Sequence, residues 1–429
     1  MPTIEFSLRD LQSLLGKKIT LNELENLLNY AKGELVDSNN NIRINLEDTN
    51  IPYLWSVEGL ARLLQGLIGK NHSFPQLNVS NSSYVINVES SVMKVRTYIG
   101  AFIAKGKKLN QDLLHQLIQL QEKLCETYGR KREKISIGVY NVNKISFPVK
   151  YRAVGPNEVS FIPLDYNKKM NLREILINHP KGKQYSKILA NFDRYPILID
   201  AKDNVLSFPP IINSNYSGQV NINDDNLMVE VTGNDEESIQ LSLNIFAFLL
   251  QDRGFKVYQV KIKYPNKAVV FPKPFNQKIK IDNTLIKNML GLNLNNNDIK
   301  KLLNKFRYKY EKGIVYVPDY RKDILHQVDI IEDIAIAYGY DNIKEQKLSS
   351  FTIGSTSSFI DFIDKSRELS IGLGFQEVMN PMLTNKTRLY QMMNIKDFGT
   401  IEIEEYISEM YSVVRTWLIP GLIELLSKN

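Results

Sequence analysis

The sequence is poor in the residues that most metal and nucleophile sites require. Its 429 residues include one cysteine, Cys125, and four scattered histidines: His72, His115, His179 and His326. A single cysteine excludes an intrachain disulfide and a zinc site built from several thiolates. Four dispersed histidines argue against a His-rich metal cluster and against a Ser-His-Asp catalytic site. Classes of protein that depend on these groups are therefore not expected.

Long apolar segments are also missing. No run of about 18 or more apolar residues occurs, so no membrane-spanning helix is expected. The N-terminal stretch MPTIEFSLRD lacks the basic start and apolar block of a secretory signal. We therefore expect a cytoplasmic, water-soluble protein without membrane contact.

The charge balance is moderately basic. Lysine and arginine number 54 against 47 acidic residues, for a formal charge of +7. This excess permits an anionic partner such as nucleic acid, but a lysine-rich composition alone can produce it. The basic run GRKREK, residues 129–134, is accordingly either a contact for nucleic-acid phosphate or a solvated loop.

The length and the pattern of elements predict a mixed α/β, multidomain fold. Two capped helices open the chain, one after Ser7 and one after Thr20, whose side chain forms a capping box with Glu23. A polar linker is expected at 71–83. We predict four segments: a helical domain at 1–70, an α+β domain at 84–268, a small helical domain at 272–347, and a last, partial module at 350–429.

The α+β segment carries the clearest periodicities. Its two long helical patterns end at Gly129 and Gly254, and short β-like runs surround them, among them SIGVY, YPILID, LMVEV and YQVKIKY. The small domain that follows is predicted as helix, helix, strand and helix. In the last module, SSFIDFIDKSRELSIGL is predicted to be a helix that is either core or an interface.

The final helix of the small domain has an acidic face. Asp329, Glu332 and Asp333 lie at i, i+3 and i+4, so their carboxylates share one side of the helix. Asp323 precedes the helix and is placed to cap its first turn. Either water solvates this face or a cation neutralises it, and oxygen-only ligands suit a hard cation such as Mg²⁺.

Five motifs in order along the chain carry a family resemblance: LWSVEGLARLL, SIGVYN, LSFPPIIN, VEVTG and YRKDILHQVDIIEDIAIAYGYDNI. With them the sequence resembles the β subunits of phenylalanine-tRNA ligases, in the archaeal and eukaryotic cytosolic branch. The resemblance implies a tetramer of two α and two β chains. In such a tetramer the α subunit would attach phenylalanine to tRNA with ATP, while this chain would supply structural and editing domains.

The resemblance also implies the folds of the last two segments and the position at which the chain ends within the last one. The small domain would be winged-helix-like, and the last segment would be a class II synthetase-like module without its own active site. The chain stops inside that module, so a C-terminal truncation is expected. The loop DTNIPYLWS departs from the family pattern at Ile51 and Tyr53, which weakens any polar role for it.

An editing site is the second implication. In the family it removes tyrosine that has been attached to the phenylalanine tRNA, and the matching residues here are Leu198, Ser207, Asn213, Glu230 and Thr232. An acid at Glu230 suits recognition of a phenol, and hydroxyl and amide groups suit holding the ester and a water. We expect no histidine near this site. Each of these residues taken singly also fits an ordinary structural role.

The third implication concerns the acidic helix. The family holds Mg²⁺, shared with the α subunit, at positions matching Asp323, Asp329, Glu332 and Asp333. Arginine or lysine from the α subunit is the alternative source of positive charge. The alternative for the whole chain is a non-catalytic tRNA-binding or assembly protein derived from this subunit.

Overall fold

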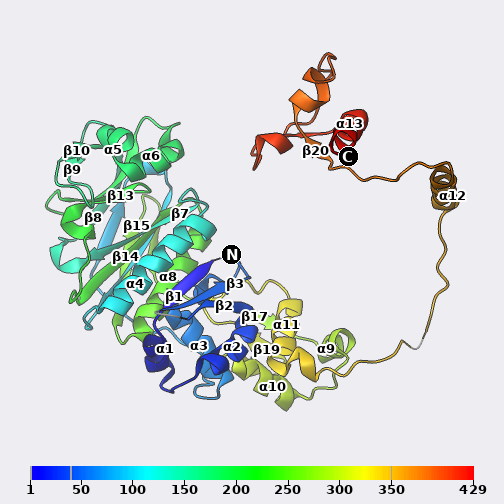
Figure 1. The fold of residues 1–429 in the computed structure, drawn as a ribbon. Helices are drawn as coiled ribbons and strands as arrows, with labels where there is room; N and C mark the ends of the chain where they lie inside the picture. The colour runs from blue at the N-terminus through cyan, green and yellow to red at the C-terminus, as the bar shows by residue number, and fades with distance from the viewer. Residues whose placement is uncertain (1, 39–40, 349) are drawn as a thin grey trace. The chain divides into compact units, whose positions relative to one another are not determined.

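The computed structural model describes residues 2–38, 41–348 and 350–429. The chain divides into two compact units, Met1–Lys344 and Glu345–Asn429 (Figure 1). The first two predicted segments and residues 272–344 of the third lie inside the first unit. Residues 1, 39 and 40 of the first segment lie outside the described residues. The mixed α/β, multidomain architecture is as predicted. The four-segment division itself stays a prediction.

The N-terminal segment contains both predicted helices, α1 (Leu8–Leu15) and α2 (Leu21–Leu28), and its longest helix is α3 (Val57–Leu67). Ser7 Oγ accepts from the Asp10 amide, and Thr20 and Glu23 form the capping box. The description of this segment as helical was wrong, because it also holds a three-stranded sheet in the order β1-β3-β2. These strands are short: β1 (Thr3–Phe6), β2 (Gly33–Asp37) and β3 (Ile42–Leu46).

A mixed sheet of eleven strands forms the centre of the first unit. Its hydrogen-bonded path runs β13-β12-β11-β8-β5-β15-β6-β14-β7, and β4 and β16 also pair with β15. The predicted runs SIGVY and LMVEV fall within its strands, and YPILID and YQVKIKY do so except for their last residues, Asp200 and Tyr264. The bounds are β4 (Val79–Ser80), β5 (Val85–Val88), β6 (Tyr98–Lys105), β7 (Ile135–Asn141), β8 (Val149–Val154), β11 (Tyr195–Ile199), β12 (Val205–Phe208), β13 (Ile212–Asn213), β14 (Asn226–Gly233), β15 (Lys256–Lys263) and β16 (Ala268–Phe271).

Two long helices pack beside this sheet (Figure 1). They are α4 (Gln111–Lys123) and α8 (Glu236–Asp252), which match the two predicted helical patterns. Near one end of the sheet, several short elements surround a smaller hydrophobic core that includes Leu172, Ile175 and Phe208. These elements are β9 (Ser160–Phe161), β10 (Met170–Asn171), α5 (Leu172–Asn178), α6 (Pro180–Tyr185) and α7 (Asn215–Gly218).

The small domain follows the predicted order of helix, helix, strand and helix. Two further short strands complete a sheet in the order β17-β19-β18. Its elements are β17 (Lys278–Lys280), α9 (Asn283–Leu290), α10 (Asn296–Lys305), β18 (Lys309–Glu311), β19 (Ile314–Tyr316) and α11 (Gln327–Tyr338). The label winged-helix-like stays a prediction.

The second unit holds α12 (Ser358–Gly372), β20 (Leu383–Thr384), β21 (Val413–Val414) and α13 (Ile419–Lys428). Its buried cluster is small and consists of Leu389, Tyr390 and Val413, with Trp417 packed against them. The predicted helix is present as α12, but none of its residues is buried. Within this unit α12 is therefore not core. Among the described residues, no helix combines the length and the apolar character needed to cross a membrane.

Candidate functional site

A pocket of about 400 Å³ lies against one face of the central sheet, lined in part by α4. Three of the five predicted editing residues line it: Ser207, Asn213 and Glu230. They come from β12, β13 and β14, which are distant along the path of the sheet. The sheet curves enough to bring its two ends together, since the Tyr140 hydroxyl of β7 lies 3.3 Å from Asn213 Oδ1 of β13.

The pleat of β14 decides which side chains face the pocket. Val231 pairs in register with Gly100 of β6, and a Cβ at Gly100 would meet Leu243 and Ile239 of α8. That face of the sheet therefore packs against α8. Because side chains alternate along a strand, Glu230 lies on the opposite face, which is the pocket side.

Glu230 is a buried carboxyl group with one oxygen paired. Its side chain is 2% exposed, and Oε2 accepts from the Tyr140 hydroxyl at 2.8 Å. Oε1 has no hydrogen-bond partner. Burial raises the pKa of Glu230 to about 7, although the Tyr140 hydrogen bond and the charge of Arg96 act in the opposite direction. The group is therefore poised to change charge near neutral pH and to accept a hydrogen bond from a ligand.

Ser207 and Asn213 face each other on neighbouring strands, as their register shows. Ser207 is 1% exposed, and its Oγ has no hydrogen-bond partner. Buried polar atoms without partners are rare in folded proteins, because each costs about 1–3 kcal/mol. Ser207 Oγ and Glu230 Oε1 are two such atoms in the lining of one pocket, which marks it as a place where a ligand can supply hydrogen bonds.

Leu198 and Thr232 lie behind the lining rather than in it. Leu198 is fully buried on β11, where it pairs with Ser207. The Thr232 hydroxyl accepts from Arg96 Nε at 3.1 Å and lies 3.0 Å from the Ser136 hydroxyl. The Thr232 side chain is therefore engaged in a buried network. These two residues support the wall of the pocket, and direct contact with a substrate stays a prediction for them.

Arg132 and His179 are among the lining residues that were not predicted as part of the site. Arg132, in the basic run, donates to the carbonyl oxygens of Pro210 and Ile211 at 3.1 and 2.9 Å, while its Nε is buried without a partner. The basic run had been noted as a possible phosphate contact, but the sequence did not indicate that Arg132 lines this pocket.

The expectation that no histidine lies near the site was wrong, because His179 also lines the pocket. The proximity of His179 to the pocket was not predicted because this histidine is far from Glu230 along the sequence. Its Nδ1 accepts from the Lys181 amide at 3.1 Å, which caps α6, and burial lowers its pKa. A capping role of this kind accounts for the histidine without assigning it chemistry.

The acidic face of α11 is neutralised by two cations of the same chain. Arg321 binds Asp323 and donates to Asp333 Oδ2 at 2.7 Å, and Lys32 lies 2.7 Å from Glu332 Oε1. Burial acts against the charge of Arg321, but the two carboxylates hold the pKa of the guanidinium above its ordinary value. The prediction was that water solvates this face, or that Mg²⁺ or an arginine or lysine of the α subunit neutralises it. The structure supplies the positive charge from residues 32 and 321.

The fourth acid, Asp329, caps its own helix. Its Oδ2 accepts from the amides of Leu325 and His326 at 2.7 and 2.8 Å. In the described part of the chain, no group of three or more His, Cys, Asp or Glu side chains is arranged to hold a metal ion. The four predicted ligands, Asp323, Asp329, Glu332 and Asp333, do line one pocket of about 230 Å³, but Lys32 and Arg321 line it too. Mg²⁺ binding there stays a prediction, and Mg²⁺ would compete with these two cations. These carboxylates are already engaged.

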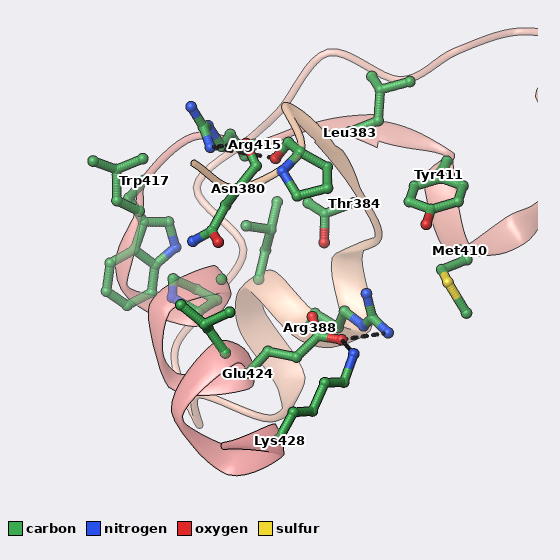
Figure 2. A pocket seen from close by; sticks show the side chains of 16 residues that line it. Asn380, Leu383, Thr384, Arg388, Met410, Tyr411, Arg415, Trp417, Glu424 and Lys428 are labelled. Atoms are coloured by element: carbon green, nitrogen blue, oxygen red, sulfur yellow. Dashed lines mark hydrogen bonds and ion pairs between the residues drawn. The ribbon is translucent and has the colours of Figure 1, made fainter. Parts of the chain in front are cut away.

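The second unit has a pocket of its own, of about 260 Å³ (Figure 2). Glu424 from α13 lies between two cations there, 3.0 Å from Arg388 and 2.7 Å from Lys428. These pairs are visible in Figure 2, with Trp417 at the far side. Because the charges are already matched and partly exposed, this pocket offers weaker evidence for a ligand than the pocket beside Glu230.

Comparison with known proteins identifies the class first. Residues 279–340 match the family model described as the tRNA synthetase B5 domain, which places the chain among proteins of tRNA aminoacylation. Residues 346–429 match the model described as the phenylalanyl tRNA synthetase beta chain CLM domain.

The relatives identify the family. The chain is 38% identical over 439 residues to the phenylalanine--tRNA ligase beta subunit of Pyrococcus furiosus, covering all of this chain and 79% of the relative. It is also 38% identical to that of Borrelia recurrentis, again over 79% of the relative. An N-terminal fragment of the Pyrococcus horikoshii beta subunit matches the fold with a TM-score of 0.76 and 37% identity, over 79% of this chain and all of the fragment. The chain belongs to the phenylalanine--tRNA ligase beta subunit family, which confirms the predicted resemblance.

Proposed function

We propose that the chain acts with a phenylalanine-tRNA ligase α subunit, in a tetramer of two α and two β chains, and that its central domain edits mischarged tRNA. The α subunit would attach phenylalanine to its tRNA at the expense of ATP. Membership of the family supports this division of labour. Exposed apolar side chains on α12, including Phe359, Phe362 and Leu369, support contact with another chain.

Three partnerless, buried side-chain atoms in one pocket carry the editing proposal: Glu230 Oε1, Ser207 Oγ and Arg132 Nε. They comprise an acceptor, a hydroxyl and a cationic donor. A tyrosyl group can donate its phenol to Glu230, whereas a phenylalanyl group leaves that acid unpaired, which costs about 1–3 kcal/mol. Ser207 and Asn213 are suited to hold the ester, the ribose and the attacking water.

Editing matters because a synthetic site for phenylalanine rejects tyrosine weakly. A pocket that merely tolerates an added hydroxyl discriminates by roughly a hundredfold. A second, hydrolytic site that requires the tyrosine hydroxyl binds tyrosine and rejects phenylalanine, which is the opposite selectivity. Glu230 would impose this requirement by accepting a hydrogen bond from the phenol. Its burial makes the difference in binding between tyrosine and phenylalanine large, because water cannot replace the missing phenol.

The test is hydrolysis of tyrosyl-tRNA and phenylalanyl-tRNA, both on the phenylalanine tRNA, by the chain assembled with an α subunit. We expect faster hydrolysis of the tyrosyl ester. Glu230→Ala should reduce the preference by about 5- to 150-fold, which corresponds to 1–3 kcal/mol. Glu237→Ala is the control, because that residue is on α8, against the opposite face of the sheet.

Two outcomes would contradict the proposal. An unchanged preference in Glu230→Ala would remove the acid from substrate recognition. Absence of hydrolysis by the assembled wild-type protein would remove editing altogether and favour the non-catalytic tRNA-binding or assembly protein.

A further inference from the structure

Tyr140 and Gly138 form an unusual pair on the pocket side of β7. Gly138 lies opposite Glu230 in the register of β7 and β14, and Tyr140 lies opposite Met228, two pairs further along. Tyr140 nevertheless reaches Glu230, with its hydroxyl 2.8 Å from Oε2. The tyrosine ring must therefore lean back along the strand, across the position of the glycine.

Gly138 is what makes this possible. A Cβ at residue 138 would lie 2.2 Å from the Tyr140 hydroxyl oxygen and 2.7 Å from Glu230 Oε2. Distances below about 3 Å are not tolerated between such atoms, so a side chain at residue 138 would collide with Tyr140 and Glu230. The backbone conformation does not demand a glycine, since Gly138 is not among the residues with positive φ. The glycine provides space for the tyrosine.

This arrangement controls which carboxylate oxygen a ligand meets. The Tyr140 hydroxyl occupies Oε2, so Oε1 is the oxygen left without a partner. Tyr140 is absent from the pocket lining, whereas Gly138 and Glu230 are part of it. Tyr140 therefore acts on a ligand through lining residues, chiefly Glu230 at 2.8 Å and more weakly Asn213 at 3.3 Å.

We propose that Tyr140, lying over Gly138, is a positioning residue that fixes the Glu230 side chain and reserves Oε1 for the phenol of the tyrosyl ester. This inference rests on the proposed editing function. It adds two residues, Tyr140 as the hydrogen-bond donor and Gly138 as the source of space for its ring, that together would hold the acid in one orientation. Without the tyrosine, both oxygens would be free and the side chain could rotate.

The hydrogen bond also favours the charged carboxylate, which is the stronger acceptor. Loss of the Tyr140 hydroxyl should therefore raise the pKa of Glu230 above its value of about 7. The other charged or titratable groups that act on Glu230 are Tyr151 and Arg96, which bonds the Thr232 hydroxyl on the same face of β14. The charged or titratable residues of the lining are Glu122, Arg132, Asp165, His179 and Lys181.

The experiment measures hydrolysis of tyrosyl- and phenylalanyl-tRNA across a range of pH, with the chain assembled with its α subunit. In Tyr140→Phe we expect the tyrosyl preference to fall about tenfold, and the pH midpoint of that preference to move upward. Gly138→Ala should change both in the same direction, because the added methyl displaces the ring. The double variant should lose no more of the tyrosyl preference than the more affected single variant, because both substitutions remove the same hydrogen bond.

Tyr264→Phe is the matched control. Tyr264 is also buried, and its hydroxyl bonds to the backbone of Ile99 rather than to a residue of the pocket. It should lose stability without moving the pH midpoint. A normal midpoint and preference in Tyr140→Phe would overturn the proposal while leaving editing intact.

A second measurement needs no tRNA. Infrared titration of the carboxyl band, with Glu230→Gln subtracted from the wild type, gives the pKa of Glu230 directly. We expect a higher pKa in Tyr140→Phe and an unchanged pKa in Tyr264→Phe. Equal values in all three proteins would overturn the positioning role, whereas failure of the wild type to hydrolyse tyrosyl-tRNA would overturn the proposed function. The two failures are therefore distinguishable.

Discussion

Replacing Glu230 by glutamine should stabilise the protein at high pH and leave its stability nearly unchanged at low pH. Burial raises the pKa of Glu230 from 4.5 to about 7. The folded state therefore binds this proton more tightly than the unfolded chain does. The free energy of unfolding consequently falls as the pH rises through this interval, because the carboxylate must ionise in a buried position.

The magnitude follows from the size of that rise. Each pH unit between 4.5 and about 7 corresponds to about 1.36 kcal/mol, so the ionised carboxyl costs ~3 kcal/mol above pH ~7. Glutamine at the same position stays neutral and can still accept from the Tyr140 hydroxyl. We therefore expect Glu230→Gln to raise the free energy of unfolding by ~3 kcal/mol at about pH 8.5, and by less than about 1 kcal/mol at about pH 5.

Urea unfolding of both proteins, followed by circular dichroism at the two pH values, measures this difference. Glu236→Gln is the control. Burial acts against the charge of Glu236, but Lys267 and Lys273 hold its pKa below the ordinary value, so it is ionised at both pH values. Its effect should not change between them. An equally pH-independent effect of Glu230→Gln would refute the reasoning, because the buried carboxyl would then not be the titrating group.

The acidic helix gives further predictions. Arg321→Met should lower the free energy of unfolding by about 3–5 kcal/mol, because it leaves Asp323 and Asp333 buried without a cation, whereas Lys309→Met at an exposed pair should change it by less than about 1 kcal/mol. Asp329→Ala should cost about 1 kcal/mol through loss of the cap. A chelator should leave the unfolding midpoint of the chain unchanged, and a clear decrease would support the Mg²⁺ prediction. Urea titrations measure all of these effects.

Local patterns predicted the regular elements well. The caps at Ser7 and Thr20 and the long helices α4 and α8 follow from spacing within a few residues. The sheet of the N-terminal segment was missed, although Ile4 and Phe6 alternate with polar residues as in a strand. A strand of four residues gives too few repeats to outweigh two clear helices, and its partners lie far along the chain.

Local sequence patterns could not predict the pocket either, because its residues are also far apart along the chain. Glu230 and Ser207 were placed by family resemblance, but their meeting depends on how far a sheet of eleven strands curves. Arg132 and His179 belong to loops and short helices that the curvature brings to the pocket. No periodicity encodes such distances. The role of Gly138 required coordinates, because a glycine inside a strand is equally consistent with a bulge.

Two buried acids show how pairing separates a structural carboxylate from one available to a ligand. Asp333 accepts from both Arg321 and Tyr308, so its burial is compensated within the chain. Glu230 is equally buried but keeps Oε1 unpaired, and its closest donor is a neutral hydroxyl. Sequence spacing had drawn attention to the acids of α11, because three carboxylates converge there. The unpaired oxygen, rather than the number of nearby acids, indicates where a substrate can bind. A ligand that donates a hydrogen bond to a buried, unpaired atom relieves its desolvation penalty, whereas a carboxylate that is already paired gains little from a ligand.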